Sequence, residues 1–498
     1  MIKAILINFS CIFFLVAISN RHVTGQTYLN QFHGKKAHSY DLEGSLHLLN
    51  LCEQQPEHIQ KIFETAFNKL STDPRYSFAD LAKDKDFRKL CAENGIVHTG
   101  GPMLGNLSEQ GVNIWIRTLY PAKVEVKVEG DGTGKKFGPV GSTEASDLTA
   151  VVKITGLNPD TRYNYTILLD GKPLELDRET FFTTLPREGR PGKTNIAFGS
   201  CYHRWGLCNK RLAEQIISRK PLAMLINGDI AAQDRNNNIA MHRADYLLRD
   251  FHTAWRKLSA TIPVYTTWDD HDYFDNDLYN IPEGFTEEDK IAVSDIFRIS
   301  WNNPPYGSGD DGHGVFFRTR TGPADVIMLD NRYFREEGNF LGDVQMKWLE
   351  EQLLDCKGPF IILSNGTMFS DYVSGGKDSW GRFDPQGREK IFSLIEKHHI
   401  GGVLLISGDR HGARGFKIPR PSGFHFYEFG AASLGGRVGP PPIRADWDTQ
   451  LYGVSGEYAF GEFSFDTTLP DPEVTFRLIH ESGTVFYEIT LTKSQLTP

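Results

Sequence analysis

The chain has 498 residues, which is long for one domain and predicts two or three. Its apolar content of 40% and charged content of 23% are typical of an ordinary globular protein and exclude a disordered or fibrous one. The net charge of −9 argues against general electrostatic binding to nucleic acid or to an anionic membrane. It does not exclude a phosphorylated substrate, because bound metal ions can reverse the local potential.

Residues 1–25 have the features of a signal peptide. Lys3 gives a positive start, residues 4–18 form an apolar stretch, and residues 23–25 offer a cleavage site before Gln26. The apolar stretch is too short for a membrane span, and no later stretch approaches the ~18 apolar residues that a span needs. We therefore expect a secreted or periplasmic mature protein without a transmembrane anchor.

Two regions of different periodicity follow. Residues 26–97 are expected to form a helical extension, because apolar side chains such as Ile59, Ile62 and Phe63 recur at helical spacing. Residues 98–186 change to an apolar period of two, broken by Gly- and Asn-rich turns, which predicts a small immunoglobulin-like β-sandwich. A segment rich in Pro, Gly and Arg then forms a linker.

Residues 187–498 mix apolar strands with amphipathic helices, a pattern that predicts an α/β domain. The expected strands are Thr194–Phe198, Ala223–Asn227, Val264–Thr267, Ala324–Leu329, Phe360–Ser364 and Gly402–Ser407. The expected helices are Asn209–Ser218, Arg243–Leu258, Asp343–Leu354 and Arg388–His398. The C-terminal tail returns to strands, at Phe424–Phe429, Ala459–Phe465, Glu473–Ile479 and Val485–Thr492.

Charged clusters stand at the ends of these strands. Asp269 to Asp272 place three carboxylates and an imidazole in consecutive positions, where they repel one another unless a cation lies among them. Similar groups occur at Asn227-Gly-Asp229 and at Ser407-Gly-Asp-Arg-His411. Because ligands of α/β sheets bind at the carboxyl ends of strands, these oxygen and imidazole donors favour a dinuclear cation site that hydrolyses phosphate esters. The alternative is that each cluster is a solvated acidic turn.

Five cysteines remain once Cys11 is removed with the signal peptide. They are Cys52, Cys91, Cys201, Cys208 and Cys356. An odd number in an exported protein leaves one thiol for another task, and Cys201, directly after the first expected strand, is the best candidate. Cys52 with Cys91 is a plausible disulfide, and Cys208 with Cys356 is a second pairing that the sequence leaves open.

The ordered set of clusters resembles the PhoD-type alkaline phosphatases, a branch of the calcineurin-like metallophosphoesterases. The matching stretches are Phe198-Gly-Ser-Cys201, Asn227-Gly-Asp229, Trp268-Asp-Asp-His271, Leu329-Asp-Asn-Arg332 and Ser407-Gly-Asp-Arg-His411. The resemblance covers residues 98–498. It implies a four-layer α/β/β/α metallophosphatase domain over residues 187–498, preceded by the sandwich, and an exported enzyme that acts on small phosphate esters.

The resemblance also implies two sets of metal ligands. Asp229 would bridge the two ions, with Cys201 and His411 on a first ion, expected to be iron. Asp270 and Asp409 would hold the second ion, expected to be calcium. Asn365, in Ser364-Asn-Gly366, is a candidate neutral ligand of this second ion.

Some of these assignments have alternatives. Cys201 could be an inert buried thiol, and Asn365 could simply turn the chain. The family usually has Tyr three positions after the bridging Asp, where this chain has Ala232, so the first ion has an open site or a different ligand. Nearby oxygen donors are Gln233, Asp234 and Asn236.

Two further side chains are expected to act on the substrate. His271 could stabilise charge on the phosphoryl group or protonate the leaving alkoxide, and Arg410 beside Asp409 is suited to grip phosphate oxygens. Arg332 could do the same or pair with Asp330 within the fold. The rival functions are a phosphodiesterase or phospholipase-D-like activity at the same site, and a non-catalytic exported binding protein.

Overall fold

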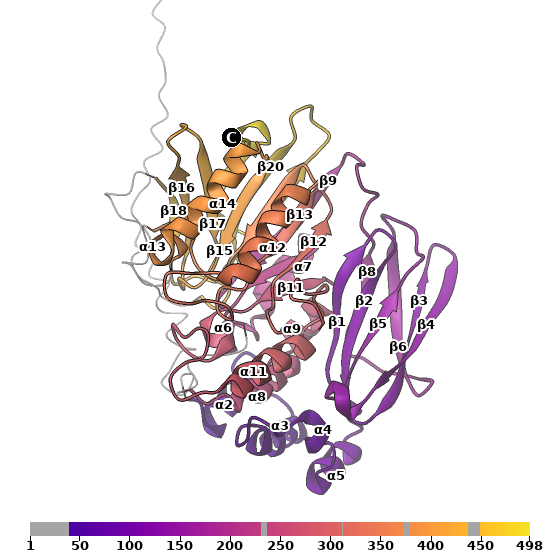
Figure 1. Ribbon diagram of the computed structural model, residues 1–498. Helices are drawn as coiled ribbons and strands as arrows, with labels where there is room; N and C mark the ends of the chain where they lie inside the picture. The colour runs from indigo at the N-terminus through magenta and orange to yellow at the C-terminus, as the bar shows by residue number, and fades with distance from the viewer. Residues whose placement is uncertain (1–38, 231–236, 311, 372–378, 437–448) are drawn as a thin grey trace, which may run out of the picture.

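The computed structural model describes residues 39–230, 237–310, 312–371, 379–436 and 449–498. The expected signal peptide and Ala232 lie outside these ranges, as do Gln233, Asp234 and Asn236. Figure 1 shows a helical N-terminal part, a β-sandwich and a larger α/β part. Within the described ranges, no helix is both long and apolar enough to span a membrane.

Within residues 39–97 the N-terminal part has four helices. They are α2 (Leu42–Leu49), α3 (Glu57–Leu70), α4 (Phe78–Leu81) and α5 (Lys85–Glu93). Helices α2 and α4 begin at side-chain caps: the Asp41 side chain accepts the Gly44 N–H at the start of α2, and Ser77 forms a capping box at the start of α4. The apolar face of α3 is buried against α8 (Met241–Phe251) of the α/β part, so these helices are packed onto the rest of the chain.

The β-sandwich consists of two antiparallel sheets around one core. The first sheet contains β1 (His98–Ser108), β2 (Gly111–Thr118) and β5 (Thr149–Ile154). The second contains β4 (Thr133–Ser142), β3 (Ala122–Gly130), β6 (Arg162–Leu169), β7 (Lys172–Pro173) and β8 (Phe181–Thr183). In β3, Val124, Val126 and Val128 face the core, as the period of two predicts. Its assignment as immunoglobulin-like stays a prediction.

The α/β part has two mixed sheets. One has the order β11 (Val264–Thr267), β10 (Met224–Asn227), β9 (Lys193–Gly199), β19 (Ala459–Asp466), β20 (Glu473–His480), β21 (Val485–Thr492). The other has the order β12 (Phe317–Thr321), β13 (Ala324–Met328), β14 (Phe360–Ser364), β15 (Val403–Ser407), β17 (His425–Gly430), β16 (Ala413–Pro419), β18 (Gln450–Val454). Strands β9 to β11 are parallel to one another, and so are β13 to β15.

Alternate side chains of these strands face different layers. Leu404 and Ile406 of β15 lie in the core between the two sheets, whereas Val403 and Leu405 pack against helices on the outside. The helices on that side are α12 (Gly342–Asp355), α13 (Trp380–Phe383) and α14 (Pro385–Lys397). The opposite side is covered by α7 (Lys210–Ser218), α8 (Met241–Phe251), α9 (Thr253–Ser259) and α11 (Glu287–Ser300). The predicted α/β/β/α layering is confirmed.

Some local predictions were incomplete. The single helix expected over 243–258 is two helices, because His252 has an extended backbone that separates α8 from α9. Helix α11 and strands β12, β16 and β18 were not predicted. The remaining short helices are α6 (His203–Gly206) and α10 (Asp270–Tyr273), and both lie beside the charged clusters.

The structure corrects the disulfide pairing. Cys52 is bonded to Cys208, with 5.7 Å between their Cα atoms, whereas Cys91 and Cys356 are free. Cys91 points instead into the core that the N-terminal helices share with α8. The prediction that Cys201 stays outside a disulfide is confirmed.

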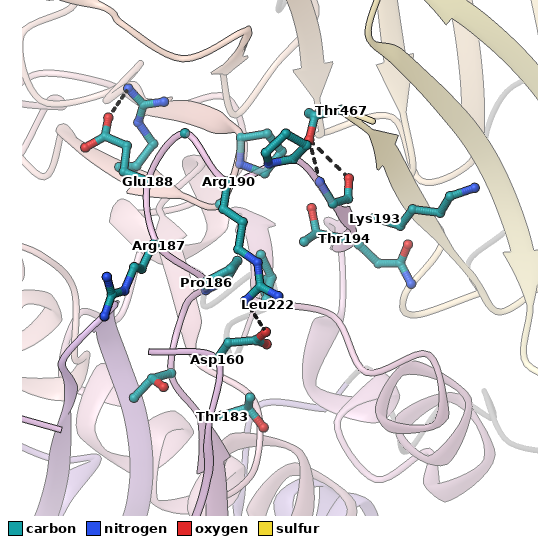
Figure 2. A pocket seen from close by; sticks show the side chains of 18 of the residues that line it. Asp160, Thr183, Pro186, Arg187, Glu188, Arg190, Lys193, Thr194, Leu222 and Thr467 are labelled. Carbon is teal, nitrogen blue, oxygen red and sulfur yellow. Dashed lines mark hydrogen bonds and ion pairs between the residues drawn. The ribbon is translucent and has the colours of Figure 1, made fainter. Parts of the chain in front are cut away.

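The linker between the sandwich and the α/β part crosses a cavity of about 560 Å³ (Figure 2). Two charged groups of the linker are paired within the fold: Arg190 contacts Asp160 at 3.1 Å, and Glu188 contacts Arg320 at 3.3 Å. At the far end, the Gly192 N–H donates to Thr467 Oγ1 at 2.9 Å, which ties the linker to the turn after β19. These contacts hold the linker in place, and the residues that line the cavity do not include the charged clusters.

Candidate metal centre

The parallel strands bring the charged clusters to one edge of the two sheets. The residues that follow a strand end are Cys201 after β9, Asp229 after β10, Asp270 and His271 after β11, Asn365 after β14, and Asp409 with His411 after β15. Neighbouring backbones interlock there, since the Cys201 N–H donates to the Gly228 carbonyl at 3.2 Å and the His203 N–H to the Asp229 carbonyl at 3.0 Å. The strands thus place separate sequence clusters in contact.

A first group of donors contains sulfur, nitrogen and oxygen. Potential ligand atoms of Cys201, His203, Asp229 and His411 all lie within 4.8 Å of one another. Cys201 Sγ is 3.4 Å from Asp229 Oδ2, and His411 Nε2 is 3.8 Å from the same oxygen. Such a mixed set suits a borderline or soft transition-metal ion.

A second group contains only carboxylates, and it also includes Asp229. Ligand oxygens of Asp229, Asp269, Asp270 and Asp409 lie within 4.8 Å of one another, and Asp229 and Asp270 form a further such group with His271. An all-oxygen set is suited to a hard cation. Because Asp229 belongs to every group, it stands where one carboxylate could contact two ions.

Asn365 lies next to the second group. Its amide Nδ2 donates to the Thr367 carbonyl at 3.0 Å, and Thr367 Oγ1 donates to Asp409 Oδ2 at 3.1 Å. Asn365 is fully buried, and its Oδ1 makes no hydrogen bond. A buried carbonyl oxygen without a partner is costly, so a cation would complete its coordination. Full burial also argues against glycosylation at this residue.

Two members of these groups were not among the predicted site residues. His203 follows Cys201 by two residues in the turn after β9, and Asp269 immediately precedes Asp270. The signal for His203 was its spacing, because two donors at one strand end can reach the same point. Asp269 was visible as part of the charged cluster but had no feature that separated it from its neighbours.

The backbone is unusual at these positions. Positive φ angles occur at Cys201 (55), His203 (53), Asp229 (55), Asp409 (66) and His411 (44). Non-glycine residues seldom adopt this conformation, which costs of order 1–3 kcal/mol each and clusters at functional sites. Gly228 has φ 81 and lies so close to Asp269 that an added Cβ would be 2.4 Å from the Asp269 Cβ, so only glycine fits there.

The buried carboxylates strongly perturb one another. Burial raises the pKa of Asp229 well above its usual range, and the charges of Asp270 and Asp269 add to this effect while His271 opposes it. Burial likewise raises the pKa of Asp269 to about 7, against the influence of Arg332. A divalent cation would remove this conflict, because it stabilises every ionised carboxylate around it.

The pKa of the Cys201 thiol is shifted in the same direction. Burial raises it well above the usual value, and the neighbouring charge of Asp229 raises it further. Cys201 is therefore a poor nucleophile in the absence of a cation. A metal ion binds the thiolate and would have to displace the proton.

The two arginines of the site have different surroundings. Arg332 is fully buried and contacts Asp269 Oδ1 through Nε at 2.6 Å, which corrects the expectation that it grips phosphate or pairs chiefly with Asp330. Its backbone N–H donates to Asp330 instead. Arg410 is partly exposed, and its Nη2 lies 3.3 Å from Asp409 Oδ2, so its guanidinium is adjacent to the carboxylate group.

Comparison with known proteins agrees with this geometry. Residues 227–444 match the family model described as PhoD-like phosphatase. This stretch is a PhoD-like phosphatase domain. Residues 98–185, in the sandwich, match a separate model that is described as a domain of unknown function. The PhoD-like match contains Asp229, Asp270 and Asp409, but not Cys201 or His203.

A curated relative and two solved structures extend the comparison. Alkaline phosphatase D of Bacillus subtilis (strain 168) is 24% identical over 214 residues, which span 36% of this chain and only 35% of the relative. A structure of PhoD aligns with a TM-score of 0.65 and 19% identity over 80% of this chain and 91% of that one. A purple acid phosphatase from yellow lupin (Lupinus luteus) aligns with a TM-score of 0.59 and 14% identity over 78% and 74%. At these identities the two structures support the PhoD-type fold alone.

Proposed function

We propose that this chain is an exported, metal-dependent phosphatase that hydrolyses small phosphate esters at a dinuclear site. The observation that carries the proposal is the position of Asp229, which belongs at once to a sulfur- and nitrogen-containing group and to an all-carboxylate group. Its Oδ1 is buried without a hydrogen-bond partner. The PhoD-like family match and the phosphatase name of the curated relative support the same reaction class.

The donors present fit two different ions. Cys201, His203 and His411 would hold the first ion with Asp229, and we propose iron because a thiolate favours a redox-capable, softer metal. Asp270, Asp409 and the Asn365 oxygen would hold the second with Asp229, and we propose calcium for this oxygen-only set. When bound, the two ions would lower the pKa of a shared water toward ~7 and neutralise charge on the phosphoryl oxygens.

The remaining side chains of the site act on the substrate. Arg410, beside Asp409, binds phosphate oxygens with its guanidinium. His271 is buried beside Asp229 and Asp270, and we assign its imidazole the role of proton donor to the departing alkoxide. Asp269 holds Arg332 and is proposed to orient the carboxylate group rather than to bind substrate.

Buried aromatic side chains give no support to a diester pocket. Trp205, Tyr273, Phe274 and Trp380 could have formed the walls of a diester pocket, but all four are fully buried in hydrophobic cores. A non-catalytic binding protein is disfavoured, because a decayed site would have lost several donors. Here every proposed ligand is present, and His203 adds one that the sequence had not suggested.

The direct test measures bound metals together with activity. The purified protein is expected to contain about two metal ions per chain by mass spectrometry and to hydrolyse nitrophenyl phosphate or bis-nitrophenyl phosphate. Removal of the ions with a chelator should abolish hydrolysis, and returning them should restore it. Full activity in metal-free protein, or a single bound ion in fully active protein, would refute the dinuclear proposal.

A further inference from the structure

The described part of the N-terminal extension, residues 39–97, packs against α8 of the α/β part (Figure 1). Ile62 and Phe63 of α3 lie in one apolar cluster with Leu247 and Leu248 of α8. Trp205, from the turn that follows β9, is part of the same cluster. The extension therefore contacts the segment of chain that carries Cys201 and His203.

Two further ties join the extension to this segment, residues 201–208, which we call the Cys201–Cys208 loop. The disulfide between Cys52 and Cys208 fixes the end of the loop. In its middle, the buried Arg204 guanidinium donates to Ser45 Oγ at 2.5 Å and pairs with Asp245 of α8 at 3.1 Å. The loop is thus held covalently at one position and by a charge-assisted hydrogen bond at another.

Trp205 connects these ties with the proposed ligands. The imidazole of His203 stacks on the Trp205 indole, with 4.8 Å between ring centroids and 25° between ring planes. The indole Nε1 donates to the Gly435 carbonyl at 2.9 Å, and the Gly435 N–H donates to the Cys201 carbonyl at 2.7 Å. Arg204 and Trp205 therefore both contact the extension, and Trp205 also packs against the imidazole of His203.

The loop needs such support, because it has little regular structure of its own. It contains only the four-residue helix α6. Its backbone has positive φ at both Cys201 and His203, a conformation that persists only where surrounding structure enforces it. Contacts from outside the loop must therefore fix the direction in which both donors point.

We propose that the N-terminal extension is a positioning clamp for the first metal ion. It holds the Cys201–Cys208 loop so that Cys201 and His203 face Asp229. The inference rests on the proposed function, since it assigns a role at the same dinuclear site. The carboxylates Asp270 and Asp409 belong to other loops, after β11 and β15, so the clamp acts on one ion more than on the other.

The test is a Cys52→Ser/Cys208→Ser double variant of the full chain, with Cys356→Ser as the matched control. Cys356 is a free thiol at the end of α12, outside the loop and the extension. Wild type and variants are loaded with iron and calcium, exposed to increasing EDTA, and analysed for each retained metal. The double variant should release the first ion at a roughly tenfold lower EDTA concentration, as is typical when contacts that orient metal ligands are lost. It should retain the second ion as wild type does. The control should match wild type for both ions.

Activity separates positioning from general damage. Turnover of the double variant should follow its content of the first ion and recover when that metal is supplied in excess, whereas KM of the loaded protein should stay unchanged. Ser45→Ala provides a milder variant should the double variant not fold, because it removes only the hydrogen bond to Arg204. We expect it to weaken retention of the first ion about threefold.

The outcomes distinguish the clamp from the proposed function. Folded variants that retain both ions as wild type does, or that release both equally, would overturn the clamp. A wild-type protein that binds two metals and is active would meanwhile leave the proposed function standing. A wild-type protein without metals or activity would overturn the proposed function itself.

Discussion

The Asp272 carboxylate holds the backbone of Asp229, whose N–H donates to Asp272 Oδ2 at 2.5 Å. The next N–H, of Ile230, donates to Asp272 Oδ1 at 2.9 Å. Two hydrogen bonds to one charged group stabilise the turn in which Asp229 has its left-handed backbone. Asp272, the last acid of the cluster after β11, thus acts on the backbone of the proposed bridging residue.

Replacing Asp272 with Asn should loosen this turn. The amide can accept only one of the two N–H groups of Asp229 and Ile230, and its NH₂ group faces the other. We therefore expect metal affinity to fall ~10–100-fold, as for other residues that orient a metal ligand. Asp275→Asn is the matched control, because Asp275 also accepts a backbone N–H, from Asn237, but is absent from the ligand groups. Chelator titration of both variants checks the prediction. Equal metal retention in the two variants would show that the Asp272 contacts do not support the site.

The bridging role of Asp229 predicts a joint loss of both ions. Asp229→Asn removes the one charge that the two ligand groups share. Bound metal and turnover should therefore be lost together. The chain should stay folded, because the neutral amide does not carry the charge whose burial raises the pKa of Asp229. Metal analysis, activity and circular dichroism on one preparation measure this. Loss of a single ion would place Asp229 on that ion alone.

Most of the α/β architecture could be predicted because its signals are local. Strands such as β14 and β15 are short apolar runs, and the charged clusters directly follow their ends. Parallel strands meet at one edge of a sheet, so Asp229 and Asp270 could be expected to approach each other. Helix α11 was missed because its apolar residues are interspersed with charge, and its start depends on a capping box at Thr286.

Contacts between distant segments could not be predicted. The disulfide joins Cys52 to Cys208 across a sequence separation of 156 residues, and nothing local distinguishes this pairing from that with Cys91. Arg332 was expected to act with its near neighbour Asp330, but the packing of two loops directs its guanidinium to Asp269. His203 became a candidate ligand only once the folded turn after β9 was seen to bring its imidazole within 4.8 Å of the donors of Cys201, Asp229 and His411.

The buried His252 predicts a loss of stability in acid. Burial lowers its pKa to about 3, with Arg256 and Arg204 adding to the effect, whereas the unfolded chain has the ordinary value of ~6.5. Between these values the unfolded state binds the additional proton, so the free energy of unfolding falls as pH decreases from ~6.5 toward ~3, by up to ~1.4 kcal/mol per pH unit. Above pH ~6.5 this residue contributes no further pH dependence.

Urea unfolding of the metal-free protein between pH 4.5 and 7 measures that slope. His252→Gln should have a smaller slope than wild type by up to one proton, whatever its absolute stability. His58→Gln, on the exposed side of α3, is the control and should keep the wild-type slope. An unchanged slope in His252→Gln would show that His252 does not stay neutral in the folded protein.

His271 is expected to serve proton transfer more than metal binding. It directly follows Asp270, a proposed ligand, in the helical turn α10. Although burial raises the pKa of Asp270, Arg332 and His271 hold it below its usual range. His271→Ala should keep both metals yet lower turnover ~10²–10⁴-fold, the usual contribution of a positioned acid or base. The loss should be smaller for nitrophenyl esters than for alkyl esters, because nitrophenolate leaves with little protonation. Metal content and turnover on both ester classes decide the role: loss of a metal would make His271 a ligand, and an equal loss for both esters would assign it to phosphate binding.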